Sequence, residues 1–248
     1  MQDKRHRTGR GALRALILIG ALIGVSGAAG WSVTAQAANR GYTITSFDAI
    51  RVEAPVNVIV TTGMGVSARA DGDQQMLDRL KVDVSGRLLS ITMERARPGE
   101  SGGGAVTLRL STGLLNRIVL TGGGSVAVNR MKGQRGEIVL GGNGDVSVGA
   151  VELDQIEVAL AGGGRATLNG RAGVANIRIT GPGAVEAGGL SARQASISND
   201  GAGSVTLTAD INARLRASGS GDMTVTGKAA CSVENSGTGR VRCGGKSF

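Results

Sequence analysis

Apolar side chains recur with a period of 18–20 residues along positions 116–244. Each period contains a short turn of small residues that ends in glycine, and the residues six before, two after and four after that glycine are apolar. In chain order these positions are Ile118, Val126, Val128, Ile138, Val146, Val148, Val158, Ala166, Leu168, Ile177, Val185, Ala187, Ile197, Val205, Leu207, Leu215, Met223, Val225, Val233, Val241 and Cys243. The residues between them are mostly polar or small, and such alternation predicts strands that bury one face.

The small-residue turns are the second repeated feature. They comprise residues 122–124, 142–144, 162–164, 181–183, 201–203, 219–221 and 237–239. We expect their glycines to adopt positive φ, because that conformation lets a chain reverse without a Cβ clash. Another group of glycines, five or six residues after the closing glycine of a turn, predicts a second turn zone at Gly149, Gly170, Gly188, Gly189 and Gly227. The pattern leaves open whether a coil contains two or three strands.

One repeat cannot bury its apolar face alone, whereas stacked repeats place equivalent side chains over one another about 4.8 Å apart. The predicted fold is therefore all-β, a parallel β-solenoid with about 18–20 residues per coil. Within a single domain at 47–248, residues 116–244 are expected to form seven glycine-turn coils.

Residues 47–115 also alternate between apolar and polar positions, but less regularly. We expect this irregular N-terminal section to cap and continue the same core, because the end units of solenoids differ from the inner ones. Residues 71–79 are expected to form one helical turn. Residues 97–105, which contain Pro98 and three consecutive glycines, are expected to form a loop.

Residues 1–37 have the order of a secretory signal peptide. Five basic residues lie within the first 14 positions, an apolar stretch covers residues 15–25, and Ala35-Gln36-Ala37 offers a cleavage site. The alternative is an uncleaved membrane anchor, although the apolar stretch is short for a span of about 20 residues. Residues 38–46 are interpreted as a linker. Export predicts a periplasmic or cell-surface location, with no membrane span after cleavage.

Composition restricts the candidate sites. The chain has 43 glycines among 248 residues and four aromatic residues, so the core must be aliphatic and aromatic platforms for sugars or bases are scarce. Cleavage after Ala37 lowers the basic residues from 28 to 23 and the acidic residues from 19 to 18, so the formal net charge falls from +9 to +5. It also removes His6, the single histidine, which excludes histidine-dependent triads and metal sites.

The chain resembles the bacterial putative auto-transporter adhesin head GIN domain family in several segments. These are Phe47-Asp48-Ala49-Ile50-Arg51-Val52, Val56-Asn57-Val58-Ile59-Val60, Leu114-Leu115-Asn116-Arg117-Ile118 and Thr121-Gly122-Gly123-Gly124-Ser125-Val126. The resemblance extends over about residues 47–244. It implies an exported envelope protein with a β-helical fold. The family has no established function and offers no catalytic residues to assign.

Cys231 and Cys243 are the two cysteines of the chain. In an exported protein such a pair favours a disulfide, which here would fasten the last coil. The alternative is a pair of buried thiols, because Cys243 occupies an inward aliphatic position.

Two groups of acidic residues are candidate sites. The segment Gly142-Asn143-Gly144-Asp145 resembles the start of a calcium-binding repeat, but the next coil has Arg165 where a ligand would be needed. A glycan-cleaving site needs clustered acids. The acids Asp145, Glu152, Asp154 and Glu157 are near in sequence but are expected on different faces or turns.

Asn199 and Asn235 occupy a position where earlier coils have leucine. We interpret them as hydrogen-bonding to the local turn backbone. The alternative is a hydrogen-bonded amide site.

These observations predict no catalytic, cofactor-binding or metal-binding residues. The expected function is structural or adhesive display of a rigid solenoid surface in the cell envelope. The alternative is a binding module for an envelope glycan or protein partner, and a polysaccharide lyase or hydrolase is the third interpretation. Expected partners are an envelope polymer, a protein or a second copy. Dispersed basic residues and scarce aromatics disfavour nucleic acid.

Overall fold

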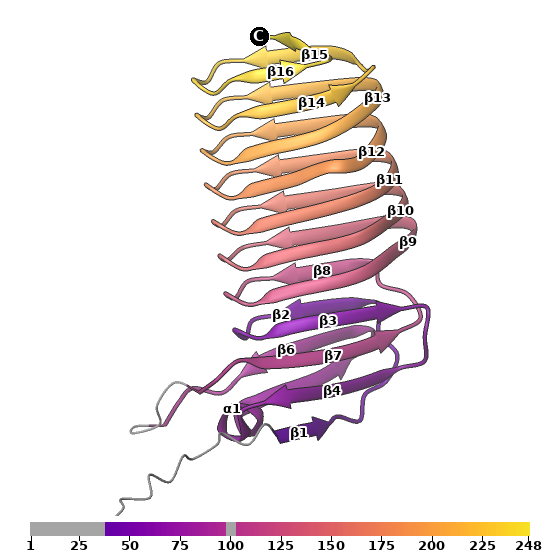
Figure 1. Cartoon of the computed structure of the whole chain (residues 1–248), viewed down its shortest axis with the longest axis vertical. Helices are drawn as coiled ribbons and strands as arrows, with labels where there is room; N and C mark the ends of the chain where they lie inside the picture. The colour runs from indigo at the N-terminus through magenta and orange to yellow at the C-terminus, as the bar shows by residue number, and fades with distance from the viewer. Residues whose placement is uncertain (1–37, 98–102) are drawn as a thin grey trace, which may run out of the picture. The chain divides into compact units, whose positions relative to one another are not determined.

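The computed structural model describes residues 38–97 and 103–248 (Figure 1). The predicted parallel β-solenoid is confirmed. The expected signal peptide at 1–37 lies outside the described residues, as does the middle of the expected loop at 97–105. Within the described ranges, no helix is both long and apolar enough to cross a membrane.

Most coils consist of one long strand that bends as it circles the core. These strands are β9 (Ser125–Leu140), β10 (Asp145–Leu160), β11 (Arg165–Ile179), β12 (Ala184–Asn199) and β13 (Ser204–Ala217). Each pairs in parallel with the next, and the predicted columns meet in register, with Val126 opposite Val146 and Ile138 opposite Val158. All the predicted inward positions are buried except Val233, which is half-buried.

Each coil has three short segments rather than two strands joined by a second turn. In β10 the buried residues are Val146, Val148, Val151, Leu153, Ile156, Val158 and Leu160. The spacing of two residues is interrupted twice by a spacing of three, which marks two bends. We call the outer surfaces of the three segments faces A, B and C; in β10 they comprise residues 145–148, 151–154 and 155–160. The predicted second turn zone is thus a bend within a continuous strand.

The reason for glycine in the seven turns also differs from the prediction. Among the described residues, positive φ occurs at glycines outside these turns: Gly63, Gly86, Gly133, Gly170, Gly227, Gly244 and Gly245. Instead, the turns stack so closely that a Cβ on Gly164 would overlap the carbonyl oxygen of Gly144. The Gly164 N–H also donates to the carbonyl oxygen of Gly142 at 3.2 Å. Contact between successive coils therefore excludes a side chain.

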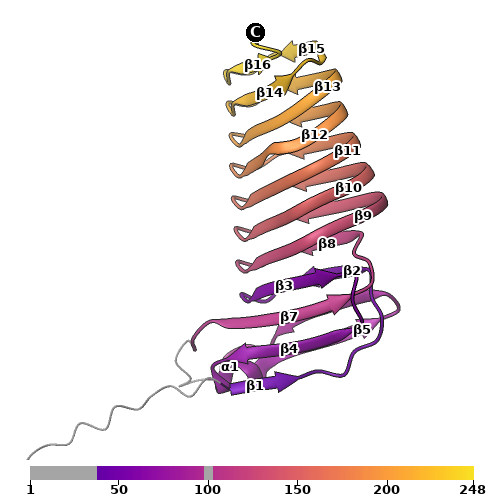
Figure 2. The ribbon, with the colours of Figure 1, turned by 45° about the vertical axis from the view of Figure 1, so that its right-hand side comes forward.

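In the N-terminal section the stacking order departs from the chain order. Strands β2 (Ala49–Val52) and β3 (Asn57–Thr62) form a coil that lies between two later ones (Figures 1 and 2). Below it lie β6 (Leu88–Met93) and β7 (Val106–Thr112), and above it lie β8 (Arg117–Leu120) and β9. Ile50 is therefore opposite both Leu89 and Ile118.

Antiparallel strands and a helix close this end of the stack. Strand β4 (Ser67–Gly72) pairs with β7, β5 (Leu80–Ser85) pairs with β6, and β1 (Ala38–Gly41) pairs with β4. The predicted helical turn is α1 (Gln74–Arg79), whose N-terminus is capped by the Asp73 carboxylate. The prediction of a linker at 38–46 was wrong for its first residues, since β1 belongs to the sheet.

The C-terminal end contains four short strands. They are β14 (Met223–Gly227), β15 (Ala230–Asn235), β16 (Val241–Cys243) and β17 (Lys246–Ser247). A disulfide joins Cys231 in β15 to Cys243 in β16, with their Cα atoms 6.1 Å apart. The last two coils are thereby linked covalently.

Candidate functional site

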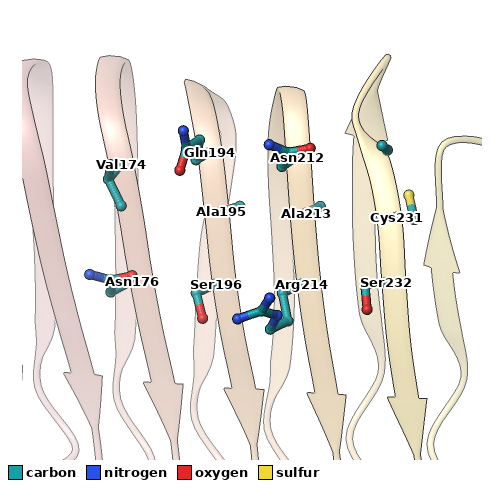
Figure 3. Close-up of a pocket in the computed structure, with 11 residues that line it drawn as sticks. Val174, Asn176, Gln194, Ala195, Ser196, Asn212, Ala213, Arg214, Cys231 and Ser232 are labelled. Carbon is teal, nitrogen blue, oxygen red and sulfur yellow. The ribbon is translucent and has the colours of Figure 1, made fainter.

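Two adjoining cavities lie on face C. The larger, of about 540 Å³, lies across β11, β12, β13 and β15 (Figure 3). The smaller, of about 400 Å³, lies across β9, β10, β11 and β12. Both are lined by Asn176 and Ser196. Together they form a depression that crosses successive coils, which we call the face C groove.

Strand register places the side chains of the larger cavity in three rows. Gln194 and Asn212 lie beside each other in one row, Ala195 and Ala213 in the next, and Ser196 and Arg214 in the third. Figure 3 shows the rows continuing to the neighbouring strands: the first row begins with Val174, the second reaches Cys231, and the third runs through Asn176, Ser196, Arg214 and Ser232. Because parallel pairing continues without a shift in this segment, each row crosses successive coils. The third row is polar throughout, the first is polar at Gln194 and Asn212, and Ala195 and Ala213 between them are nearly fully buried.

The polar side chains of the groove are available to a ligand. Within the described residues, no hydrogen bond or salt bridge engages the side chains of Asn176, Gln194, Asn212 or Arg214. Amides offer donors and acceptors, and a guanidinium offers donors that fit carboxylates or hydroxyls. The sequence interpretation missed these residues. Gln194 and Asn212 are 18 positions apart and Asn176 and Ser196 are 20 positions apart, as the glycine turns are, and this spacing was the signal that could have identified the rows.

Ion pairs between coils border the groove. Arg178 contacts Asp200 at 3.2 Å, and Arg216 contacts Glu234 at 2.9 Å. The hydrogen bond from Arg216 holds the pKa of the Glu234 carboxyl below its ordinary value, and the same pairing raises the pKa of Arg216. Such exposed pairs contribute little to stability, and their main effect here is to fix the position of charge beside the groove.

The four candidate acids are not brought together. Asp145 on face A accepts a hydrogen bond from the Arg165 backbone N–H at 3.2 Å, which is a use other than metal binding. Glu152 and Asp154 belong to face B and Glu157 to face C. In the described part of the chain, no three His, Cys, Asp or Glu residues are grouped as metal ligands would be.

Register reveals one acidic pairing that the sequence interpretation did not consider. Glu137 lies opposite Glu157 on face C. Glu137 is paired with Arg117 at 3.2 Å, and Glu157 accepts a hydrogen bond from Gln155 at 2.8 Å. Both carboxylates therefore have partners within the sheet.

The interpretation that Asn199 and Asn235 bond to the local turn backbone is confirmed, although Asn199 is buried and Asn235 is exposed. The Asn199 amide donates to the Gly203 carbonyl oxygen at 2.7 Å and accepts from the Gly201 N–H at 3.2 Å. Asn235 repeats this with Gly239 and Gly237 at 3.3 and 3.2 Å. These side chains hold the following turn in place and are not free to bind a ligand.

Comparison with known proteins identifies one family and several solved structures that share the fold. Residues 46–229 match the family described as "Putative auto-transporter adhesin, head GIN domain". No curated protein matches the sequence at a significant level. The family and the structures below are named for adhesion or binding, not for enzymatic activity.

Three solved structures share the fold. A putative adhesin from Bacteroides fragilis NCTC 9343 is 21% identical with a TM-score of 0.78, covering 84% of this chain and 97% of its own. A putative lipid binding protein from Parabacteroides distasonis ATCC 8503 is 20% identical with a TM-score of 0.67, covering 83% and 96%. A putative adhesin from Parabacteroides merdae ATCC 43184 is 18% identical with a TM-score of 0.60, covering 84% and 95%. At these identities the likeness shows the fold alone.

Proposed function

Because the chain belongs to the putative auto-transporter adhesin, head GIN domain family, we propose that it is an exported cell-envelope protein that binds an extended envelope polysaccharide through face C. The observation that carries the proposal is the face C groove, in which uncommitted polar side chains repeat across successive coils. The solenoid acts as a rigid support that holds these groups at fixed spacing.

The chemistry of the groove suits a hydroxyl-bearing polymer. Gln194, Asn212 and Asn176 present amides, Ser196 presents a hydroxyl, and Arg214 presents a guanidinium. A polymer that follows the groove meets one polar side chain of the third row at each coil, about 4.8 Å apart. Because each contact is weak, affinity depends on the number of coils engaged, as in multivalent binding.

Export is supported by two features of the sequence. Residues 1–37 have the order of a signal peptide, and the Cys231–Cys243 disulfide suits an oxidising compartment such as the periplasm or the cell surface. The proposed role is adhesive rather than catalytic, because Glu137 and Glu157, which line the smaller cavity, are engaged with Arg117 and Gln155.

Binding to purified envelope polysaccharides of the host tests this proposal. The full-length protein is immobilised and titrated, and the Asn212→Ala/Arg214→Ala variant is compared with Thr206→Ala/Thr224→Ala on face A. We expect the face C variant to bind at least about tenfold more weakly, since two hydrogen-bonding groups are lost. The face A variant should bind like the unmodified protein, because Thr206 and Thr224 are opposite each other on face A and not in the groove.

Two outcomes would contradict the proposal. If both variants bind equally well, face C is not the contact surface. If no polysaccharide binds and the protein instead captures an envelope protein or a second copy, the polymer assignment is wrong. Fractionation of the host cells with an antibody against the protein tests the location separately.

A further inference from the structure

Exposed apolar side chains are concentrated in the N-terminal section. Among the described residues, six large apolar side chains are exposed: Ile59, Met64, Val66, Leu114, Ile211 and Phe248. Four of them belong to the N-terminal section. Met64 and Leu114 are the most exposed, at 60% and 58%, although the neighbouring Leu115 is fully buried. The loops that carry Met64 and Leu114 thus expose apolar side chains to solvent at positions where the fold does not require an apolar residue.

Met64 and Leu114 lie on two loops that are tied to each other. The Gly63 N–H donates to the Gly113 carbonyl oxygen at 3.0 Å, and the Met64 N–H donates to the Thr112 carbonyl oxygen at 3.3 Å. The Ser111 hydroxyl also donates to the Gly65 carbonyl oxygen. These bonds hold the two loops side by side, so a partner would meet a prearranged apolar surface.

Two cations adjoin these loops. A cavity of about 260 Å³ is lined by Gly63, Gly113 and Leu114 together with Arg130 and Lys132, and no acidic side chain lines it. Arg130 contacts Glu152 at 3.5 Å, whereas no salt bridge engages Lys132 within the described residues. We call residues 63–66 and 113–115, together with Arg130 and Lys132, the loop tip.

We propose that the loop tip docks onto the surface of an anionic lipid bilayer. Met64 and Leu114 enter the boundary between headgroups and acyl chains, and Arg130 and Lys132 contact lipid phosphates. Exposed apolar groups beside cations are the combination that binds such a surface, because apolar burial and electrostatic attraction act together. The loop tip shares no lining residue with the face C groove, so a failure of one proposal can be told apart from a failure of the other.

Site-specific fluorescence tests the proposal without interference from residues 1–37. The native cysteines are joined in a disulfide, so an added cysteine is labelled selectively. The full-length variants Met64→Cys, Leu114→Cys and, as a control at an exposed apolar site, Ile211→Cys carry a polarity-sensitive dye. With phosphatidylglycerol vesicles we expect the emission to shift to the blue at positions 64 and 114 but not at 211. Phosphatidylcholine vesicles should produce no such shift.

A charge variant then measures the electrostatic part. In labelled Leu114→Cys protein, adding Lys132→Ala should raise the anionic lipid concentration needed for half the shift about fivefold, since a cation near the surface contributes about that factor. Circular dichroism melting checks that each variant folds. The proposal is overturned if positions 64 and 114 show no shift, if Ile211→Cys shifts equally, or if neutral vesicles act as well as anionic ones. It is also overturned if the dye shifts without lipid as a dimer forms.

Discussion

In the coils from β9 to β13, strands that follow one another in the chain also lie beside one another in the stack, whereas in the N-terminal section most of them do not. There the coil of β2 and β3 lies between the later coils β6–β7 and β8–β9. Repetition lets each regular coil cover the previous one. A first coil has no predecessor to cover it, so later strands, in part antiparallel, and α1 return to close the core beneath it.

The small-residue turns of the regular coils and the loop at Gly63 use glycine for different reasons. In the regular turns a side chain would strike the carbonyl oxygen of the coil below, as at Gly164 and Gly144. In the N-terminal section Gly63 has φ +82°, and a Cβ added there would meet no atom within 4 Å, so only the backbone conformation requires glycine. Stacking therefore restricts side-chain volume in the small-residue turns, whereas the loop at Gly63 restricts the backbone angle.

The largest loss of stability is expected from a charged substitution in the core of the regular coils. Ile138 is fully buried between Ile118 and Val158. Ile138→Asp buries an unpaired charge and should lower the free energy of unfolding by at least about 4 kcal/mol. The matched control is Ala159→Asp, whose side chain is exposed on face C. Chemical denaturation of both variants measures the difference, and a near-normal midpoint for Ile138→Asp would refute the inward register.

The C-terminal end, which lacks the irregular strands of the other end, depends on its disulfide. Cys231→Ser/Cys243→Ser should lower the free energy of unfolding by roughly 3 kcal/mol in the chain-entropy model, because the loop of 12 residues is no longer closed. Melting with and without reductant checks this. Two reactive thiols in denatured, unreduced protein would show instead that no disulfide forms.

The turn at 122–124 rests on the N-terminal section and contains a matched pair of glycines. A Cβ on Gly124 would overlap the Val56 carbonyl oxygen and lie 2.8 Å from its nitrogen, whereas a Cβ on Gly123 meets nothing within 4 Å. Gly124→Ala should therefore cost about 2–3 kcal/mol of stability, and Gly123→Ala close to none. Equal midpoints in urea denaturation would contradict the stacking explanation.

A smaller loss of stability is expected from substitution of Gly63, because the positive φ is the only reason for glycine there. Gly63→Ala should lower the free energy of unfolding by about 1 kcal/mol, because an L-residue is strained in the left-handed region. Gly63→Asn should lose less, since asparagine tolerates that region better. If the alanine variant is as unstable as Gly124→Ala, the distinction between the two uses of glycine fails.

The regular half of the fold could be predicted because its information is local and repeated. The spacing of Ile138, Val146 and Val148 is the same in neighbouring coils, so the register follows from the sequence alone. The position of β2 and β3 could not be predicted, because alternation shows that Ile50 faces inward but not which strands cover it. Likewise, the sequence identifies Gly164 as a turn residue but not the carbonyl oxygen above which it lies.

The candidate site was missed for a related reason. Asn176, Gln194 and Asn212 look like ordinary exposed polar residues when each coil is taken alone. Only the register between coils places them along one groove. By contrast, the pairing of Cys231 with Cys243 and the turn contacts of Asn199 depend on nearby residues and were predicted.

Disulfide trapping tests most directly whether the N-terminal coil lies within the stack. Arg51 in β2 and Val119 in β8 are opposite each other, and Val139 is one coil further away. After mild oxidation, the Arg51→Cys/Val119→Cys protein should contain a new cross-link in its peptide map. Arg51→Cys/Val139→Cys should not, because two strand spacings, about 9.6 Å, exceed the reach of a disulfide. Cross-linking of the 51–139 pair but not the 51–119 pair would contradict the stacking order described above.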